Sequence, residues 1–364
     1  MKKLIMDKME HLASAFRKVL YTEDEQFMEN MKNNNLADDN PMRYRFWEWT
    51  QGVGLYGIWK MYKLTGDKKY KDELINYYNE RIKEGLPSKN INTVAPLLAL
   101  AFLNEEVNNK EYTDICNEWV EWIMNELPRT KEGGFQHITS DTVNENELWD
   151  DTLFMTVLFL AKMSQINNNK RYLEEAKYQF LIHIKYLFDK ETGLWYHGWT
   201  FNGNNNFAKG LWGRGNCWIT LAIPEFIRIV PLEDSFKRYL SEVLINQVKS
   251  LKEKQNTSGM WHTLLDDPTS YDEASATCGF GAGILSGIEI GIIDESYAEI
   301  AFNAVKPILK LIDDEGVLNQ VSYGTPMGRQ DLQFYKDIPL QPMPYGQALG
   351  ILFLGDVLKY EFNK

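Results

Sequence analysis

The clearest hydrophobic pattern in the chain is ELWDDTLFMTVLFLAKM, residues 147–163, in which polar residues precede an apolar run of about three or four helical turns. Units of this kind recur along the chain, each with an apolar helix, a polar loop and a second helix. They begin near Trp49, Asn92, Trp149, Trp212, Ser275 and Pro344, and the last unit is partial. Successive units start about 43, 57, 63, 63 and 69 residues apart, which is too irregular for a helical solenoid.

The two helices of a unit differ in character. In several units the first helix is apolar on nearly all sides and rich in Gly and Ala, as expected for a helix surrounded by neighbours. The second is amphipathic and carries Glu and Lys, which is typical of an outer layer. Six such pairs predict an all-α fold, an (α/α)6 barrel of six inner and six outer helices. We expect strands only in linkers, at residues 134–138, 193–200 and 316–321.

The length of 364 residues fits one barrel, so residues 1–364 are expected to form a single domain. The N-terminal segment MKKLIMDKMEHLASAF carries charges at Asp7, Lys8 and Glu10 that interrupt any signal-peptide core, and it reads as an amphipathic helix. We therefore expect a cytoplasmic protein. We also expect a monomer or a weak homodimer.

Charge and composition narrow the possible partners. A net charge of −12 without a long Lys/Arg run argues against nucleic acid and against an anionic membrane surface. The 11 Trp, 19 Tyr and 18 Phe suit both a large core and a carbohydrate-lined cleft. Cys116, Cys217 and Cys278 are an odd number without metal-ligand spacing, so we expect neither a disulfide framework nor a metal site.

Three linkers contain a histidine: His137 in GGFQHI, His197 in GLWYHGW and His262 in GMWHTLL. Each linker leads from an outer helix to the next inner one, so the linkers should gather at the end of the barrel where the inner helices begin. Loops on a rigid scaffold are where sites are usually built. The chain has only five histidines, and three in equivalent loops favour a site over loop residues without a common role.

Two adjacent carboxyl groups, Asp150 and Asp151, follow Trp149 at the start of the third apolar helix. Acidic residues at this place often cap backbone N–H groups. A general acid needs a raised pKa; burial beside Trp149 and repulsion within the pair would raise the pKa, whereas a helix N-terminus would lower it. The pattern by itself leaves both roles open.

A second constellation lies in GLWGRGNCW, where glycines allow a sharp backbone turn. It contains two indoles, a guanidinium and an amide, from Trp212, Arg214, Asn216 and Trp218. This set suits a sugar acid, because indole faces stack on sugar C–H surfaces and arginine can bind a carboxylate through two hydrogen bonds. Alternatively, Arg214 pairs with a structural carboxylate such as Glu225 or Asp151.

WDDTLFMTVLFLAKM, GLWYHGW and WGRGNCW, in this order, resemble the unsaturated rhamnogalacturonyl hydrolases, glycoside hydrolase family 105, which are related to the unsaturated glucuronyl hydrolases. WTQGVGLYGIWKMYKLTGDKKY and QPMPYGQALGILFL resemble the same family, so the likeness extends from about Trp47 to the C-terminus. The resemblance implies an (α/α)6-barrel glycoside hydrolase that removes the Δ4,5-unsaturated uronic acid left by pectin lyases from a small oligosaccharide. It also implies hydration of the double bond, without a metal or organic cofactor.

The resemblance implies roles for individual residues. The family's catalytic aspartate stands two positions after the tryptophan and before a Leu-Phe-Met-like triplet, which corresponds to Asp151. Many members have an aspartate where this chain has Asn92, so the distal hydroxyls of the substrate should be recognised differently. With the histidine linkers included, the expected substrate-binding residues are Asn92, His137, Asp150, His197, Trp212, Arg214, Asn216, Trp218 and His262.

Other functions remain open at this stage. An unsaturated glucuronyl hydrolase acting on another polysaccharide would use the same site. A sugar epimerase or isomerase on the same barrel would use two histidines, such as His197 and His262, as acid and base. A non-catalytic carbohydrate-binding barrel would use the aromatic residues only for stacking, because a fold alone does not determine function.

Overall fold

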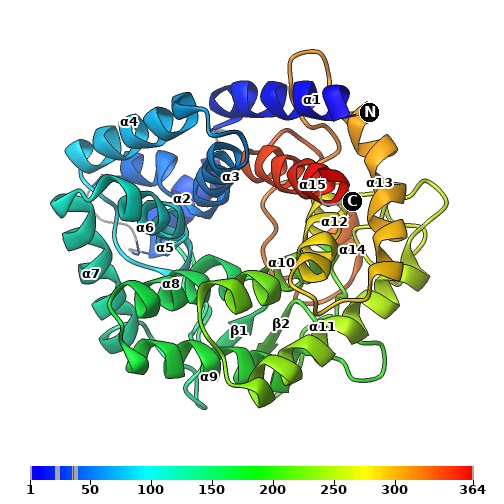
Figure 1. Ribbon diagram of the computed structural model, residues 1–364. Helices are drawn as coiled ribbons and strands as arrows, with labels where there is room; N and C mark the ends of the chain where they lie inside the picture. Colours follow the sequence, from blue (N-terminus) through cyan, green and yellow to red (C-terminus); the bar gives the residue numbers. More distant parts are fainter. Residues whose placement is uncertain (1, 21–24, 35, 37–39, 363–364) are drawn as a thin grey trace.

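The computed structural model describes residues 2–20, 25–34, 36 and 40–362 of the chain. Within these residues, six helices form an inner ring: α3 (Trp49–Thr65), α6 (Pro96–Val107), α8 (Leu158–Ile166), α10 (Gly213–Ile229), α12 (Ala274–Glu289) and α15 (Pro344–Phe362). Each contacts the next, and α15 contacts α3, so the ring is closed (Figure 1). The expected (α/α)6 barrel is confirmed.

The outer layer of the described residues has one feature that the sequence did not suggest. Five outer helices follow their inner partners: α4 (Lys68–Glu84), α7 (Lys110–Asn125), α9 (Lys170–Leu187), α11 (Asp234–Lys254) and α13 (Ala298–Leu311). The sixth is the N-terminal helix α1 (Lys2–Ala15), which packs along α15 (Figure 1). The first helix of the chain therefore completes the last, partial unit.

The first three connections between an inner and an outer helix share one local structure. In each turn, a residue with positive φ stands directly before the N-cap of the outer helix. The N-cap itself is an Asp or Asn whose side chain accepts a hydrogen bond from a backbone N–H of that helix. The pairs are Gly66 with Asp67, Asn108 with Asn109, and Asn168 with Asn169. Gly and Asn tolerate the left-handed region, and Asx side chains are good N-caps. These short turns hold each outer helix antiparallel to its inner partner.

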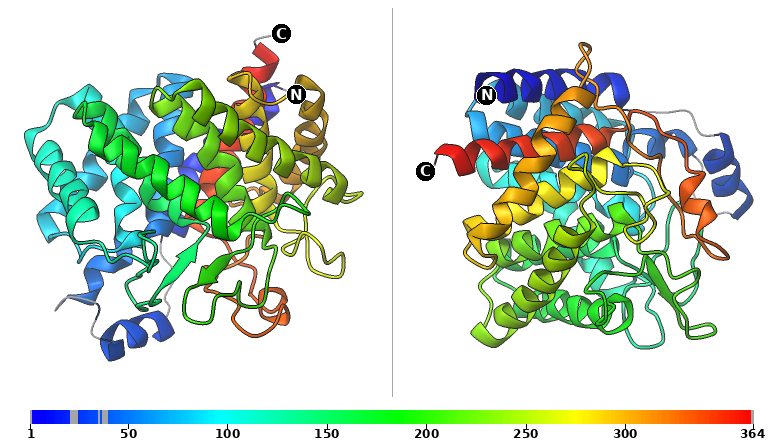
Figure 2. Two further views of the ribbon diagram at one scale, coloured as in Figure 1. Left: turned by 90° about the horizontal axis from the view of Figure 1, so that it is seen from below. Right: turned by 90° about the vertical axis from the view of Figure 1, so that its right-hand side faces the viewer.

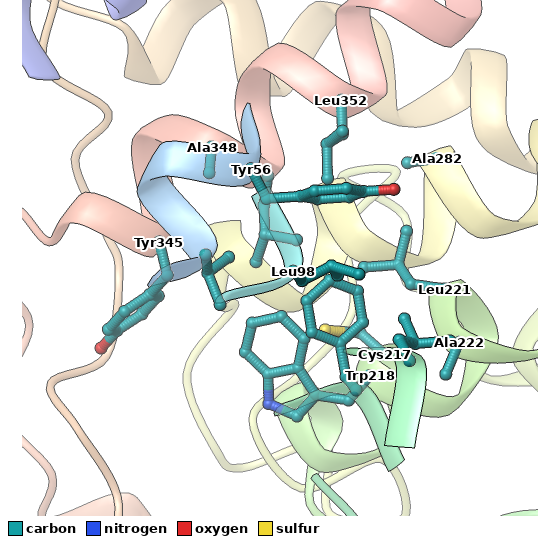
Figure 3. Close-up of a cluster of buried hydrophobic side chains, with 14 of the residues drawn as sticks. Tyr56, Leu98, Cys217, Trp218, Leu221, Ala222, Ala282, Tyr345, Ala348 and Leu352 are labelled. Carbon is teal, nitrogen blue, oxygen red and sulfur yellow. The ribbon is translucent and has the colours of Figure 1, made fainter. Parts of the chain in front are cut away.

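The core lies inside the ring, where side chains from several inner helices meet. Figure 3 shows Tyr56 of α3, Leu98 of α6, Trp218 of α10 and Ala282 of α12 within one apolar cluster. Glycine allows the inner helices to approach closely: a Cβ added at Gly283 of α12 would lie 2.4 Å from the backbone oxygen of Thr220. Cys116, Cys217 and Cys278 are buried free thiols.

Short strands and irregular segments lie at the end of the barrel where the inner helices begin, as Figure 2 shows. Strand β1 (Glu147–Trp149) pairs antiparallel with β2 (Gly198–Thr200), with Leu148 opposite Trp199. The strand expected at residues 193–200 is thus present in part, whereas those expected at 134–138 and 316–321 make only single bridges. β1 was not expected, because its residues look like the polar entrance to a helix.

The third inner helix starts irregularly. A π-helical turn, Leu153–Val157, precedes α8 and begins two residues after Asp151. Such turns insert one extra residue into a helix and are frequent at functional sites. No helix in the described part of the chain is long and apolar enough to cross a membrane.

The close approach between α10 and α12 predicts a specific loss of stability. Gly283→Ala should lower the free energy of unfolding by about 1–3 kcal/mol, because the new methyl group meets the Thr220 backbone and the two helices must separate. The matched control is Gly355→Ala on α15, where the added Cβ would meet only side-chain ends at 3.4 Å. The control should gain up to about 1 kcal/mol from helix propensity. Chemical denaturation of both variants gives the comparison, and equal effects would contradict the packing argument.

Candidate active site

A cavity of about 380 Å³ lies at the end of the barrel where the inner helices begin. This volume is within the ~300–1,000 Å³ range of small-molecule sites. Its wall includes the start of α3, the short helix α5 (Ile91–Val94), the linker between α7 and α8 that carries both His137 and Trp149, and residues 323–326. Five of the residues expected at the site line it: Asn92, His137, Asp151, Trp212 and Trp218.

Asp151 presents its carboxyl group to this cavity. The side chain is 16% exposed, and its Oδ1 atom has no hydrogen-bond partner among the described residues. Burial raises the pKa of Asp151 to about 7, although the positive charge of Arg214 acts in the opposite direction. A carboxyl group that titrates near neutral pH can both give and accept a proton.

Asp150 lies behind Asp151 and does not line the cavity. It is completely buried, and neither of its oxygens has a hydrogen-bond partner in the described part of the chain. It packs against the first turn of α10, where a Cβ added at Gly215 would lie 2.2 Å from its Oδ2. Burial and the charge of Asp151 raise the pKa of Asp150 well above its usual value. The charge of Asp151 therefore favours the protonated form of Asp150.

His137 stands beside Asp151 in an electrically neutral form. Its Nδ1 is 2.7 Å from Thr152 Oγ1 and 3.4 Å from Asp151 Oδ1. Burial lowers the pKa of His137 to about 3, so the contact with Asp151 is not an ion pair at neutral pH. The ring stacks on Trp149 with a centroid distance of 4.3 Å and an interplanar angle of 8°.

Besides stacking on His137, Trp149 is held by polar contacts. Its indole Nε1 donates to Glu147 Oε2 at 2.9 Å, and Arg329 pairs with the other oxygen of Glu147 at 2.6 Å. The Arg329 side chain also donates to Asn144 at 3.0 Å. This network joins the late linker that carries Arg329 to the wall that carries Trp149.

His197 and His262 do not line the cavity, contrary to the expectation from their linkers. His197 is buried behind the wall with its Nδ1 2.8 Å from the Tyr335 hydroxyl, and burial keeps its pKa well below the usual value. His262 lies in its own loop, 2.8 Å from the Ser270 carbonyl oxygen and 3.2 Å from Asp272. Because the linkers fold back differently, only one of the three histidines reaches the cavity. An epimerase that uses His197 and His262 as a pair is therefore not supported.

Arg214 is also buried, and the donors on both of its terminal nitrogens are engaged by protein. Nη1 donates to the Ser322 carbonyl oxygen at 2.7 Å, and Nη2 donates to Tyr323 O at 2.9 Å and Thr325 Oγ1 at 2.8 Å. Glu273 lies 3.8 Å away as its buried counter-charge. The arginine thus holds the segment that forms one wall of the cavity. Contact of either terminal nitrogen with a substrate carboxylate would require the exchange of at least one of these bonds.

The remaining residues of the GLWGRGNCW motif divide into two groups. Asn216 is completely buried, and its amide exchanges two 2.8 Å hydrogen bonds with the backbone of Trp195. It therefore fixes the linker before β2 rather than facing the cavity. Trp212 and Trp218 do line the cavity, and Trp218 meets Trp49 edge to face at 6.2 Å.

Several lining residues were missed by the sequence analysis. Glu48 stands directly before the first inner helix and Trp49 is the first residue of that helix; Asp151 lies at the corresponding entrance in its own unit, so the repeat pattern contained a signal for them. Residues 323–326 and Met343 come from the last linker, which has no histidine or glycine motif to mark it. Arg45 is the one Lys or Arg among the described lining residues.

Comparison with known proteins gives a consistent result. Glycosyl Hydrolase Family 88 matches residues 20–361. The unsaturated rhamnogalacturonyl hydrolase YesR of Bacillus subtilis (strain 168) is 30% identical over 316 residues, which are 86% of this chain and 90% of that protein.

Solved structures agree in fold. A possible member of glycoside hydrolase family 105 from Salmonella enterica subsp. enterica serovar Paratyphi A is 42% identical with a TM-score of 0.91, covering 100% of this chain and 95% of that one. The unsaturated glucuronyl hydrolase of Bacillus sp. GL1 is 16% identical with a TM-score of 0.71, covering 100% and 97% of the two chains, and this likeness concerns the fold alone. The chain therefore belongs to Glycosyl Hydrolase Family 88, and it is a glycoside hydrolase whose expected kinship with the unsaturated rhamnogalacturonyl hydrolases is confirmed.

Proposed function

We propose that the enzyme removes a Δ4,5-unsaturated uronic acid from the end of a small oligosaccharide, with unsaturated galacturonyl-rhamnose from pectin rhamnogalacturonan as its substrate. The observation that carries this proposal is Asp151, a buried carboxyl group with an unpartnered oxygen, a pKa of about 7 and direct access to an aromatic-lined cavity. The name of the Bacillus subtilis relative supports the choice of substrate. An unsaturated glucuronide of another polysaccharide is the alternative.

The proposed reaction is a hydration. In the unsaturated uronate, the C4=C5 bond and the ring oxygen form a vinyl ether. Protonated Asp151 gives its proton to C4, which leaves an oxocarbenium-like centre at C5. Water adds at C5 and returns a proton to the Asp151 carboxylate, so one carboxyl group acts first as acid and then as base. No metal or organic cofactor takes part in these steps.

The bond to the next sugar breaks without further help from the enzyme. The hemiketal at C5 then opens. The bond from C5 to the ring oxygen breaks, C5 becomes a ketone carbonyl, and the former ring oxygen becomes a hydroxyl group on C1. C1 is then a hemiacetal, which releases the neighbouring sugar and leaves an aldehyde. This scheme departs from the usual pair of carboxylates in glycoside hydrolases. It fits a site in which only Asp151 of the Asp150–Asp151 pair faces the cavity.

The other residues take supporting roles in this proposal. The indoles of Trp212 and Trp218 stack on the sugars, and the Asn92 amide binds a hydroxyl group. Neutral His137 orients Asp151 without holding it in the charged form. Three buried residues position the walls rather than touch the substrate: His197, Arg214 and Asn216. His262, in its own loop, receives no role.

We further propose that residues 1–364 act as a single catalytic domain in the cytoplasm, as a monomer or a weak homodimer. The packing of α1 on α15 supports one domain, because the two ends of the chain belong to the same ring.

The proposed function is tested with a matched pair of substrates. The enzyme should abolish the ultraviolet absorbance of unsaturated galacturonyl-rhamnose and release rhamnose, because hydration removes the double bond. The saturated disaccharide with the same linkage should not be cleaved, because it offers no carbon to protonate. An unsaturated glucuronyl disaccharide run in parallel distinguishes the alternative substrate. Comparable cleavage of the saturated compound would contradict hydration.

Asp151 and Asp150 should differ in their contribution to the rate. Asp151→Asn should lower kcat by at least about a thousandfold, because the proton donor is lost. Asp150→Asn is the matched control. The amide has the same shape as the buried carboxyl group that it replaces, so this change should lower kcat much less. Steady-state kinetics on folded variants checks both values. Turnover near that of the wild type in Asp151→Asn would remove this residue from the mechanism.

Arg214 should act through the wall of the cavity. Arg214→Ala should lower kcat/KM by a similar factor for the free acid and for its methyl ester, because the guanidinium binds residues 322–325 rather than the substrate. The variant should also unfold more easily, by about 3–5 kcal/mol, since Glu273 loses its buried partner. If the alanine variant does not fold, the same comparison of substrates can be made with Arg214→Lys, which keeps the positive charge but lacks the planar guanidinium group. A loss confined to the free acid would show direct contact with the carboxylate.

A further inference from the structure

Glu48 is a carboxyl group of the cavity that the proposed mechanism leaves unused. It stands at the N-terminal boundary of α3, lines the cavity together with Asn92, and is only 6% exposed. In its unit it lies at the entrance to an inner helix, as Asp151 does in the third unit. Glu48 and Asp151 therefore reach the same cavity from the entrances of different inner helices, and Asp141 of a linker lines it as well.

The position of the Glu48 carboxyl group is fixed by its neighbours. The Ser140 hydroxyl donates to Oε1, and Ser140 itself accepts a 3.0 Å hydrogen bond from the Asn90 amide. The backbone N–H of Trp49 donates to Oε2 at 3.3 Å. The Glu48 backbone N–H donates to the Gln51 side chain at 3.1 Å. A long side chain held on several sides is pre-organised to meet a ligand.

The surroundings favour the neutral form of this group. Burial raises the pKa of Glu48 to about 8, and the nearby charge of Asp141 acts in the same direction. Hydrogen bonds from Ser140, the Trp49 backbone and the Asn92 side chain offset this shift only in part. The cavity is also lined by Asp151, neutral His137 and Arg45. At neutral pH Glu48 thus offers one O–H donor and one carbonyl acceptor, and it adds no charge that would repel an anionic sugar.

We propose that Glu48 is a substrate-binding residue that, with Asn92, binds hydroxyl groups of the unsaturated uronate and so helps to determine which sugar the cavity accepts. This inference rests on the proposed function and deepens it. Glu48 supplies the carboxyl group that Asn92 lacks, from the neighbouring inner helix. Its role is binding, and proton transfer stays with Asp151.

The alternative is that Glu48 only caps α3, and paired variants separate the two roles. If Glu48 binds substrate, Glu48→Ala should raise KM at least about tenfold and change kcat less than about threefold, since a lost hydrogen bond to bound sugar weakens binding rather than chemistry. Glu48→Gln keeps a donor and an acceptor, so its KM should stay within about threefold of the wild type at neutral pH. The matched control is Asp67→Ala, which removes an exposed cap from α4 outside the cavity and should leave KM unchanged.

The dependence of kcat/KM on pH separates the two roles, because a residue that only caps a helix would not change its slope. Between about pH 8 and pH 9.5 the wild type should lose kcat/KM more steeply than one decade per pH unit, because Asp151 and Glu48 both ionise. Glu48→Gln should lose about one decade per unit, because only Asp151 remains to titrate. This measurement stands even if Glu48→Ala fails to fold.

The outcomes distinguish the two proposals. A wild-type enzyme that consumes no unsaturated uronide would overturn the proposed function and this inference with it. An active wild type together with an unchanged KM in Glu48→Ala would overturn the role of Glu48 alone, as would an unchanged pH slope in Glu48→Gln. A raised KM in Glu48→Ala, its rescue by Gln and a shallower pH slope support the inference.

Discussion

Burial of carboxyl groups at one end of a closed helical ring is the constraint on which the site depends. An ionised carboxylate that loses water without gaining partners is costly, so the group holds its proton to a higher pH. Neither carboxyl oxygen of Asp150 has a hydrogen-bond partner in the described structure, and one carboxyl oxygen of Asp151 also has none. The ring makes this possible, because the starts of α3, α5, α10 and α15 and the entrance to α8 surround one cavity with aromatic walls. A pKa near 7 for Asp151 follows from that enclosure.

The charged residues around the cavity hold its walls in place. Arg214 ties residues 322–325 to α10 and has Glu273 as its buried counter-charge, while Arg329 ties the same late linker to Glu147 and thus to Trp149. A buried charge is tolerated when it is paired and hydrogen bonded, and here the pairing fixes segments far apart in sequence. Glu48 and Asp151, by contrast, face the cavity without a salt bridge to Lys or Arg among the described residues. Glu48 keeps its proton at neutral pH and Asp151 is about half protonated, so these two groups repel an anionic substrate less than two ionised carboxylates would, even though the net charge of the chain is −12.

The sequence predicted the barrel because each unit alternates an all-apolar helix with an amphipathic one. It did not show that α1 is the sixth outer helix, since that pairing joins the two ends of the chain. At the site, Asp151 and His137 were found because they stand beside recognisable helix entrances and linkers. The buried placement of Arg214 was not predictable, because its partners lie more than a hundred residues later at Ser322 and Tyr323. His262 was misplaced because its loop turns back on Ser270, which no local motif indicates.

The most direct test of the central claim is the fate of solvent atoms in the first turnovers on an unsaturated disaccharide. Hydration predicts one deuterium at C4 of the uronate product in heavy water. In oxygen-labelled water, it predicts that the label enters first at C5 and is absent from the released sugar. Direct hydrolysis would place the labelled oxygen at C1, leave C4 without deuterium and preserve the double bond in the product. That second pattern would contradict proton transfer from Asp151 to the double bond.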